Sequence, residues 1–430
     1  MNFYSLNNKS KKVSFKEATI LGQAPDKGLY YPESIPKHDK EFIDNIENYS
    51  NEEIAFKVMQ PYIKDDIDDE TLFTIVSETI NFPIPLVPIT NNISSLELFH
   101  GPTLAFKDVG ARFMSRCLSH FSKDKEVLIL VATSGDTGAA VANGFYNIEG
   151  VKVLILFPSG KVSSVQEKQL TTLGNNIHAL EVEGSFDDCQ SLVKQAFSDK
   201  EVQEKIFITS ANSINVARWL PQQIYYFLAW KQWQDKNNPP VVCVPSGNFG
   251  NICAGLLAQQ SGVPFQHFIA ACNANNTIPE FFKTKNYQPK KTVPTISNAM
   301  DVSNPSNFVR VEEMYNNNLE MLQKALSSYS ITDDETIETI KKVYQEKNYL
   351  LDPHAAVGYF ALENYLQKNP NQKGFLLETA HPVKFYDVIE PALHFKIPIP
   401  EAIESVIHKK SISTKIKVDF ETLKQVIYAL

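Results

Sequence analysis

The sequence predicts an α/β protein built on a doubly wound, mostly parallel sheet. Continuous apolar runs with the length of buried strands occur at residues 127–132, 151–157, 241–244 and 268–271, and a shorter run at 375–377 is a further candidate. Helical patterns lie between these runs. Strands that are buried on both faces and alternate with helices are typical of parallel α/β sheets, which is the fold class we expect.

The length and texture of the chain predict more than one structural unit. A chain of 430 residues is too long for a single ordinary core. Residues 1–90 are polar, with a capped helix expected from about Ser14, and we predict a small N-terminal domain there. Residues 91–390 carry the strand and helix pattern, and residues 391–430 form a C-terminal extension. Residues 285–306 are rich in Pro, Asn, Lys and Ser, which predicts a long loop or a crossing between lobes.

The composition limits the classes of partner. Hydrophobic residues make up 43% of the chain and charged residues 21%, which is typical of a globular, soluble protein. The net charge of -8 argues against a nucleic-acid partner or an anionic membrane, but it allows an anionic small substrate in a local basic pocket. No apolar stretch approaches the ~20 residues that span a bilayer.

The cysteines and the first residues indicate the compartment. Five cysteines are an odd number without paired metal-ligand spacing, so free thiols in a reducing cytoplasm are favoured over disulfides. The residues that follow Met1 lack the basic segment and apolar run of a signal peptide. We therefore expect a cytoplasmic protein without a bound metal, and the sequence leaves a monomer and a homodimer open.

Lys107 stands where a lysine is costly. The run His-Gly-Pro-Thr-Leu-Ala-Phe at residues 100–106 precedes it, and an apolar pattern with three- and four-residue spacing follows as far as Phe121. This pattern places Lys107 in the first turn of a helix, where the dipole and apolar neighbours both lower the pKa of an ammonium group. A partly neutral lysine is a nucleophile suited to Schiff-base chemistry. The alternative is a snorkelling surface lysine, which its neighbours make less favoured.

Two loops of small residues follow predicted strands and open predicted helices. Such loops bind ligands at the carboxyl ends of strands in an α/β sheet, and helix N-termini attract anions. The first loop suits a carboxylate, with a simple capped turn as an equal alternative, and consists of Thr133, Ser134, Gly135, Asp136 and Thr137. The second suits a phosphate, because successive amides form a nest, and consists of Gly247, Asn248, Phe249, Gly250 and Asn251. It has neither P-loop nor G-x-G-x-x-G spacing, so a dinucleotide is not indicated.

Further polar residues are candidates for a second anion site. The turn after residue 158 contains Lys161, although an exposed connection explains it at least as well. Residues 212–219 combine polar donors with an arginine that could bind an anion through two hydrogen bonds, although a surface arginine is more common; the candidates are Ser213, Asn215 and Arg218. His354 and His381 lie in turn-like segments without metal-ligand spacing. No Gly-x-Ser-x-Gly elbow marks a serine hydrolase.

Taken together, these segments resemble the threonine synthase family of pyridoxal-phosphate enzymes, which have the tryptophan-synthase-β fold (fold type II). One matching motif could arise by chance, but five in the expected order are very specific: residues 100–108, Thr-Ser-Gly-Asp-Thr-Gly at 133–138, Pro-Ser-Gly-Asn-Phe-Gly at 245–250, Asp-Pro-His at 352–354 and Thr-Ala-His-Pro at 379–382. The resemblance runs nearly end to end. Ala355, where the family pattern has Thr, affects no catalytic role. The resemblance implies a two-lobed enzyme with mostly parallel sheets flanked by helices and a small N-terminal domain.

The resemblance also implies a reaction, the last step of threonine biosynthesis: O-phospho-L-homoserine and water give L-threonine and phosphate. Lys107 would bind pyridoxal 5'-phosphate covalently and move protons, the loop at 247–251 would hold the cofactor phosphate, and Thr379 would meet the pyridine nitrogen. The loop at 133–137 would hold the substrate carboxylate. Asp108 could contact the region of the substrate phosphate or cap the helix of Lys107, and the cap is the favoured role. The groups expected to meet the substrate phosphate are Lys161, Ser213, Asn215 and Arg218.

Two rival functions stay open at this stage. A phospholyase or amino-acid dehydratase of the same fold would share Lys107 and the glycine loop, although the N-terminal domain and the order of the motifs favour the synthase. A catalytically silent binding protein would not need Lys107, and the presence of this lysine argues against it. Assays of phosphate and threonine release separate these possibilities.

Overall fold

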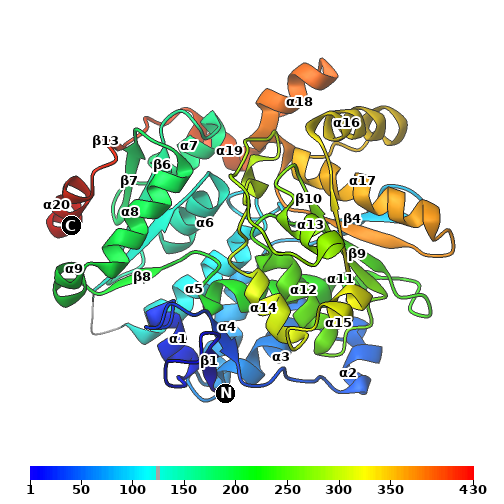
Figure 1. Cartoon of the computed structure of the whole chain (residues 1–430), viewed down its shortest axis with the longest axis horizontal. Helices are drawn as coiled ribbons and strands as arrows, with labels where there is room; N and C mark the ends of the chain where they lie inside the picture. The colour runs from blue at the N-terminus through cyan, green and yellow to red at the C-terminus, as the bar shows by residue number, and fades with distance from the viewer. Residues whose placement is uncertain (123–125) are drawn as a thin grey trace.

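Two mostly parallel sheets form the cores of two lobes in the computed structural model, which describes residues 1–122 and 126–430 (Figure 1). The larger sheet has the strand order β11-β10-β9-β12-β4-β3, and its pairs are parallel except for β3 with β4. Its strands are β3 (Leu86–Pro88), β4 (Ile93–Glu97), β9 (Val241–Pro245), β10 (His267–Cys272), β11 (Leu326–Ser330) and β12 (Gly374–Glu378).

The smaller sheet has the strand order β13-β7-β6-β5-β8, and all of its pairs are parallel. Its strands are β5 (Val127–Ala132), β6 (Val151–Pro158), β7 (Ile177–Val182), β8 (Ile208–Ser210) and β13 (Thr414–Ile416). Figure 1 shows this lobe on the left, with the C-terminal helix at its outer edge. The two sheets together confirm the predicted α/β class.

Helices flank both sheets, which explains why their strands are continuous apolar runs. Along β5, Leu128 and Leu130 pack into one core cluster, while Ile129 and Val131 pack into another on the opposite face. Because both faces are buried, no position in the strand favours a polar residue. The helices of the two lobes are α5 (Lys107–Phe121), α6 (Asp136–Phe145), α7 (Ser164–Thr171), α8 (Phe186–Ser198), α9 (Lys200–Lys205), α10 (Val216–Trp219), α11 (Gln223–Gln232), α12 (Gly250–Gln260), α13 (Thr277–Thr284), α14 (Phe308–Met314), α15 (Leu319–Ala325), α16 (Asp333–Lys347), α17 (Pro353–Lys368), α18 (Tyr386–Leu393), α19 (Glu401–Ile407) and α20 (Phe420–Ala429).

The N-terminal segment shares its core with the helix that carries Lys107. Its elements are β1 (Phe3–Ser5), paired antiparallel with β2 (Tyr30–Pro32), and helices α1 (Phe15–Leu21), α2 (Lys40–Asp44), α3 (Asn51–Ile63) and α4 (Asp69–Thr79). Ser14 caps α1 in a capping box with Glu17, as predicted. The ring of Phe15 lies 6.5 Å from that of Phe113 and 6.2 Å from that of Phe121, so this segment packs directly on α5.

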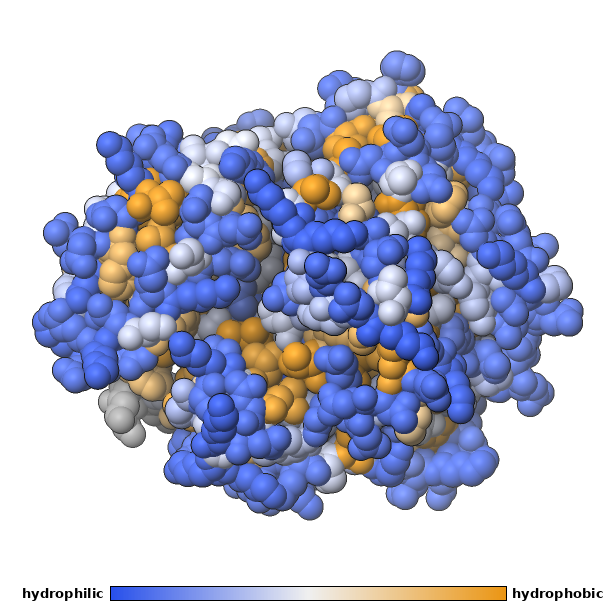
Figure 2. Space-filling view, in the orientation of Figure 1, coloured by the Kyte–Doolittle hydropathy of each residue, from blue (hydrophilic) through white to orange (hydrophobic). Residues whose placement is uncertain are grey.

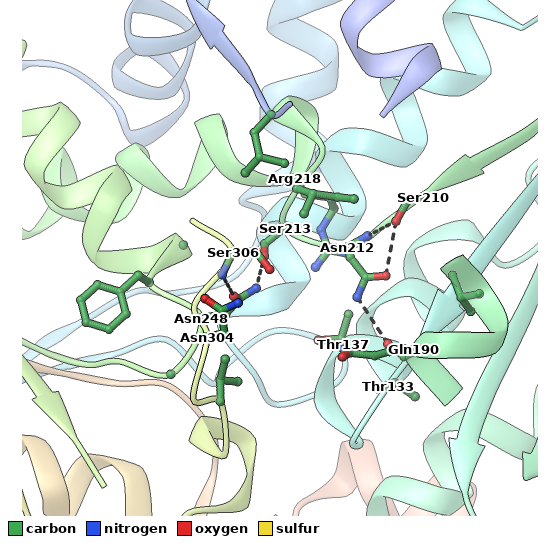
Figure 3. A pocket seen from close by; sticks show the side chains of 18 of the residues that line it. Thr133, Thr137, Gln190, Ser210, Asn212, Ser213, Arg218, Asn248, Asn304 and Ser306 are labelled. Carbon is green, nitrogen blue, oxygen red and sulfur yellow. Dashed lines mark hydrogen bonds between the residues drawn. The ribbon is translucent and has the colours of Figure 1, made fainter. Parts of the chain in front are cut away.

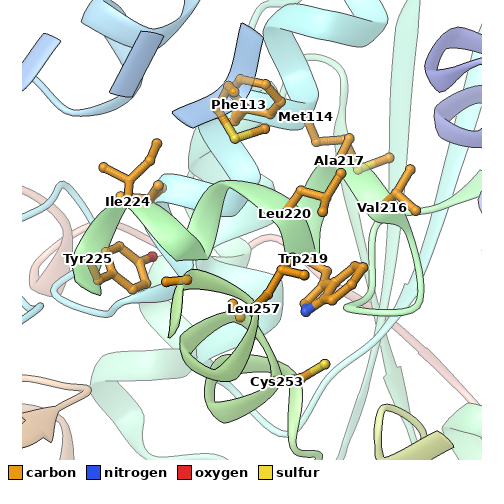
Figure 4. Packing of buried hydrophobic residues seen from close by; sticks show 14 of the residues in the cluster. Phe113, Met114, Val216, Ala217, Trp219, Leu220, Ile224, Tyr225, Cys253 and Leu257 are labelled. Atoms are coloured by element: carbon orange, nitrogen blue, oxygen red, sulfur yellow. The ribbon is translucent and has the colours of Figure 1, made fainter. Parts of the chain in front are cut away.

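The largest core cluster fixes the site-bearing helices to one another. In Figure 4, Trp219 and Leu220 lie between Phe113 of α5 and Leu257 of α12, and all four side chains are buried. Helix α5 begins at Lys107 and α12 begins at Gly250, directly after the loop at 247–249. Packing of these helices therefore fixes the two loops relative to each other.

The predicted strands and the predicted long loop are present in the structure. The five apolar runs are confirmed as β5, β6, β9, β10 and β12, and residues 285–306 hold no regular element except the short 3₁₀ helix η3 (Asn298–Met300). Further 3₁₀ helices are η1 (Ile46–Asn48), η2 (Leu220–Gln222) and η4 (Pro382–Phe385). The five cysteines are buried, free thiols. Across the described ranges, every helix is too short or too polar to cross a bilayer.

Candidate active site

A cleft of about 1960 Å³ lies at the carboxyl ends of strands from both sheets. Its walls come from the segments after β5, β6, β8, β9 and β12, and Lys107 lines it as well. The space-filling view shows the hollow between the lobes, with hydrophilic side chains around it and an apolar patch at its lower edge (Figure 2). This is the place where open α/β sheets bind ligands.

Lys107 is half-buried, and its amine belongs to this cleft. Two backbone contacts hold its loop, since Phe106 N donates to Thr379 O at 2.9 Å and the hydroxyl of Tyr225 donates to Phe106 O. Burial, followed by the charges of Lys384 and Arg218, lowers the pKa of Lys107 to about 8, although Asp136 acts in the opposite direction. The direction of the pKa shift agrees with the sequence expectation. The predicted cap by Asp108 is not formed: its carboxylate accepts from Thr103 N at 2.9 Å and from the Thr103 hydroxyl instead.

The loop between β9 and α12 presents a row of free amides to the cleft. Among the described residues, no acceptor is found for the backbone N–H groups of Gly247, Asn248, Phe249, Gly250 and Asn251. Phe249 has a left-handed backbone with φ of 60°, which turns successive amides in one direction. A Cβ on Gly247 would lie 2.6 Å from Met300 Cα, so only glycine fits there without a shift. The buried Nδ2 of Asn251 also has no partner in the described chain.

Side chains from two other segments hold this loop in place. Ser213 Oγ accepts from Asn248 Nδ2 and from Asn307 Nδ2, both at 3.0 Å. Asn248 Oδ1 accepts from Ser306 N at 2.6 Å (Figure 3). The predicted site residues Ser213 and Asn248 are therefore in contact. Asn307, which is fully buried, was missed because it lies about sixty residues after the loop in a segment without a recognisable motif.

The loop after β5 also presents free backbone amides, but the side chains of Thr133 and Asp136, which were predicted as ligands, have partners within the protein. The hydroxyl of Thr133 accepts from Gly135 N at 3.0 Å and from Gly138 N at 2.8 Å, so it shapes the loop. The amides of Ser134, Asp136 and Thr137 have no acceptor in the ranges described. The carboxylate of Asp136 is buried, lies 2.7 Å from Lys384 Nζ and accepts from Gln166 Nε2 at 3.0 Å. It can therefore contribute its backbone, but not its side chain, to an anion site.

Arg218 is a buried cation that lines the cleft. It is 4% exposed, Nη1 donates to Ala211 O at 2.7 Å, and Nε has no partner among the described residues. No carboxylate in the described chain lies within ion-pair distance of it. Burial lowers the pKa of Arg218 to about 10, and the guanidinium stays charged at neutral pH. Such a group is suited to an anionic ligand.

Two residues predicted to contact the substrate phosphate, Asn215 and Lys161, are placed differently from Arg218. Asn215 is fully buried and does not line the cleft: its Oδ1 caps α10 by accepting from Ala217 N at 3.0 Å, and its Nδ2 donates to Thr19 O at 2.9 Å. Lys161 is exposed at the edge of the cleft. Asn212, labelled near Ser210 and Ser213 in Figure 3, also lines the cleft, although the sequence did not single it out.

The Asp-Pro-His motif supports the far wall of the cleft. His354 lies 2.6 Å from Asp352 through Nδ1, and its Nε2 accepts from Ala299 N at 3.2 Å. An acceptor at Nε2 assigns the proton on Nδ1 to the hydrogen bond with Asp352. This contact holds the segment that meets Gly247. Lys384, in the segment after Thr379, is another functional candidate that sequence reasoning missed.

The residues present fit pyridoxal 5'-phosphate, the expected cofactor. Its aldehyde needs an amine such as that of Lys107, and its phosphate needs donors such as the free amides at 247–251 and Asn251 Nδ2. Gly247 leaves room for a close approach of the backbone. Thr379 lines the cleft, and its hydroxyl has no partner among the described residues, so it is free to meet a ring nitrogen.

Comparisons with known proteins give one consistent result. A family model described as "Pyridoxal-phosphate dependent enzyme" matches residues 89–376, and the models "Threonine synthase N terminus" and "Threonine synthase, C-terminal" match residues 2–80 and 355–427. The threonine synthase of Escherichia coli (strain K12) is 43% identical over 428 residues, which cover 99% of this chain and 99% of that protein.

Solved structures give the same result. The crystal structure of threonine synthase from Escherichia coli superposes with a TM-score of 0.94 at 42% identity and covers 100% of both chains. The structure of PLP-bound threonine synthase from Brucella melitensis superposes with a TM-score of 0.92 at 32% identity and covers 100% of this chain and 99% of that one.

Proposed function

The chain belongs to the threonine synthase family of pyridoxal-phosphate-dependent enzymes, and we propose that it converts O-phospho-L-homoserine and water into L-threonine and phosphate. One observation carries this choice of substrate. A single cleft holds the Lys107 amine, with its lowered pKa, together with two sets of free backbone amides and a buried guanidinium that has no carboxylate partner among the described residues. One set of amides serves the cofactor phosphate, and a substrate with both a carboxylate and a phosphate uses the other set and the guanidinium.

Three parts of the cleft hold the cofactor. Lys107 would bind it through Nζ, and the amides at 247–251 with Asn251 Nδ2 would bind its phosphate. The hydroxyl of Thr379 would meet the pyridine nitrogen, and a hydroxyl there would leave that nitrogen less protonated than a carboxylate would. When bound, pyridoxal phosphate supplies an electron sink that makes the substrate protons at Cα and Cβ acidic.

Lys107 moves the protons of the reaction. With substrate bound, Lys107 Nζ would be free to act as a base. It accepts the proton from Cα, and further transfers at Cβ and Cγ accompany the loss of phosphate. A pKa of about 8 keeps a useful fraction of the amine neutral near physiological pH. Water then adds at Cβ of the substrate, and the product that leaves is threonine.

The two anionic ends of the substrate bind at different walls. The amides of Ser134, Asp136 and Thr137 hold the carboxylate at the N-terminus of α6. The guanidinium of Arg218 holds the phosphate, with the hydroxyl of Ser213 nearby and Lys161 at the edge. As phosphate leaves, these donors stabilise the growing charge. Asn215 acts from outside the cleft, by capping the helix that carries Arg218.

The test is a product balance. Purified enzyme, loaded with pyridoxal phosphate and given O-phospho-L-homoserine, should release phosphate and L-threonine in equal amounts. Lys107→Ala, with an unchanged circular dichroism spectrum, should release neither. Phosphate with 2-oxobutyrate and no threonine would support a lyase of the same fold. Absence of turnover, with cofactor absorbance that survives Lys107→Ala, would support a silent binding protein.

The location of the enzyme is a separate part of the proposal. Five buried, free thiols suit a reducing compartment, and we place the enzyme in the cytoplasm, where small-molecule biosynthesis proceeds. Fractionation of cells that express the full chain would check this, with threonine-forming activity expected in the soluble fraction.

A further inference from the structure

Lys384 is a buried lysine that joins three segments around the cleft. Its side chain has 0% exposure, and its Nζ lies 2.7 Å from Asp136 Oδ1 and donates to Thr103 O at 2.8 Å. Asp136 opens α6 in the lobe of the smaller sheet, and Lys384 follows β12 of the larger sheet. Thr103 belongs to the loop that leads into Lys107. The ion pair therefore links the two lobes at the site itself.

The surroundings of Asp136 hold it in the carboxylate form. A buried ammonium is stable only with a partner, and Asp136 supplies one. Burial acts to raise the pKa of Asp136, but the charges of Lys384 and Lys107 outweigh it and hold that pKa well below the usual range of a carboxyl. Gln166 Nε2 donates a further hydrogen bond to the same oxygen at 3.0 Å, which adds to the preference for the carboxylate.

Charged groups from three other elements act on the Lys107 amine. Burial lowers the pKa of Lys107 most strongly, Asp136 of α6 raises it, and Lys384 of η4 and Arg218 of α10 lower it. Asp108, on the same helix as Lys107, is turned toward Thr103. Of the charged groups that act on the Lys107 amine, Asp136 is the one that carries a negative charge.

Other titratable residues line the same cleft, namely Lys161, His354 and Asp301. Lys161 is exposed at the edge of the cleft, and the ring of His354 contacts Asp352 and Ala299 N.

We propose that Lys384 is a positioning residue for catalysis: by pairing with Asp136, it keeps that carboxylate from pairing with Lys107, so that the Lys107 amine stays available as a base. The inference rests on the proposed function, because it requires Lys107 to move protons. Without Lys384, Lys107 is the cation that still acts on the buried Asp136. An opposite charge within reach favours the charged form of a lysine and shifts its pKa by about 1–3. Loss of Lys384 would therefore keep Lys107 protonated to higher pH.

The test uses Lys384→Met, which keeps the length of the side chain and removes its charge. In the cofactor-loaded enzyme, the pH midpoint of the absorbance change of the lysine-bound cofactor should move up by ~1 or more. The acid limb of the kcat profile should move up with it, so that kcat measured well below the limb falls about tenfold for each such shift. Lys384→Arg, which keeps the charge, should restore both midpoints.

A second substitution separates charge from structure. Lys384→Met with Asp136→Asn removes the carboxylate that Lys384 neutralises, so the shift should disappear although the ion pair is still absent. The control is Lys396→Met, because Lys396 pairs with Glu390 at the same distance of 2.7 Å but is 92% exposed. It should leave both midpoints in place. If Lys384→Met does not fold, Lys384→Gln, which keeps a donor for Asp136, carries the same expectation.

The outcomes are distinct. Midpoints in Lys384→Met or Lys384→Gln that equal those of the wild type would overturn the proposal, as would a shift that persists in the double variant. A loss of kcat at every pH without a shift would show a purely structural role. Failure of the wild type to form threonine would instead refute the proposed function, and the absorbance titration would still report on Lys384.

Discussion

Arg218 differs from the other buried cations in the number of hydrogen-bond and ion-pair partners that its side chain has. In the described ranges, the buried lysine and arginine side chains are those of Arg218, Arg310 and Lys384. Lys384 pairs with Asp136, and Arg310 donates to four different acceptor atoms. Arg218 donates to one carbonyl, and its Nε has no partner among the residues described. A buried guanidinium with an unpaired N–H group is costly, and because Arg218 lines the cleft, an anionic ligand there is the natural partner.

Arg218→Ala should weaken substrate binding while the cofactor stays bound. A hydrogen bond to a charged group contributes about 1.5–3 kcal/mol, so KM for O-phosphohomoserine should rise by roughly 10- to 100-fold. Steady-state kinetics measure KM, and cofactor absorbance reports occupancy. Arg116→Ala is the control, because Arg116 pairs with Glu78 and does not line the cleft. An unchanged KM would remove Arg218 from the phosphate site.

The pKa of Lys107 predicts a pH profile. Burial lowers this pKa to about 8, and the basic form of the amine is the one that accepts a proton. The neutral amine predominates above the pKa and is lost as the pH falls through it. We therefore expect kcat at saturating substrate to rise with pH and to level off above about 8, with a roughly tenfold loss per pH unit on the acid side. A profile that is flat across this pKa would contradict the assignment of Lys107 as the base.

At the scale of elements, local patterns were sufficient for most of the lobes. The runs that became β5, β6, β9, β10 and β12 are apolar apart from Lys152 of β6, because both faces of these strands are buried. Strands such as β7 and β11 were missed because half-exposed, polar residues interrupt them. The start of α5 at Lys107 and the capping box at Ser14 were visible because the signals lie within a few residues. No such local signal places Lys384 beside Asp136, 248 positions earlier in the chain.

Gly247→Ala should weaken cofactor binding through a clash between two elements. The added Cβ would lie 2.6 Å from Met300 Cα, and backbone at that distance must move. Overpacking of this kind costs about 1–3 kcal/mol, so the Kd for pyridoxal phosphate should rise by roughly tenfold or more. Equilibrium binding to the cofactor-free enzyme measures the change.

Gly250→Ala is the matched control for this loop. It keeps the backbone amide, as Gly247→Ala does, but its Cβ would meet side-chain atoms of Asn307 and Ser213 at 3.4 Å, which is ordinary contact. Its effect on the Kd should be clearly smaller. Equal losses in the two variants would mean that backbone approach to Met300 does not set cofactor affinity.

At the scale of the whole molecule, Arg310 ties the N-terminal segment to the active site. Its guanidinium donates to Tyr30 O of the N-terminal segment. It also donates to Ser213 O at 3.0 Å and to Ile214 O at 2.6 Å, both in the segment that supports the cofactor loop. The guanidinium carbon lies 4.3 Å from the centre of the Trp219 ring. Asn307 Oδ1, at 2.7 Å, completes its contacts. The N-terminal segment is therefore coupled to the loop that holds Asn248.

Arg310→Met should reduce stability and cofactor affinity together. The variant keeps apolar bulk against Trp219 but leaves three buried carbonyls without their donor, at a cost of about 1–3 kcal/mol each. We expect the thermal unfolding midpoint to fall by several degrees, and the Kd for pyridoxal phosphate to rise because the Ser213 contact with Asn248 is displaced. Lys396→Met, which removes a charge from a side chain that is 92% exposed, should change neither quantity. A lower midpoint with an unchanged Kd would show that Arg310 supports the N-terminal segment alone, and that the coupling to the cofactor loop is absent.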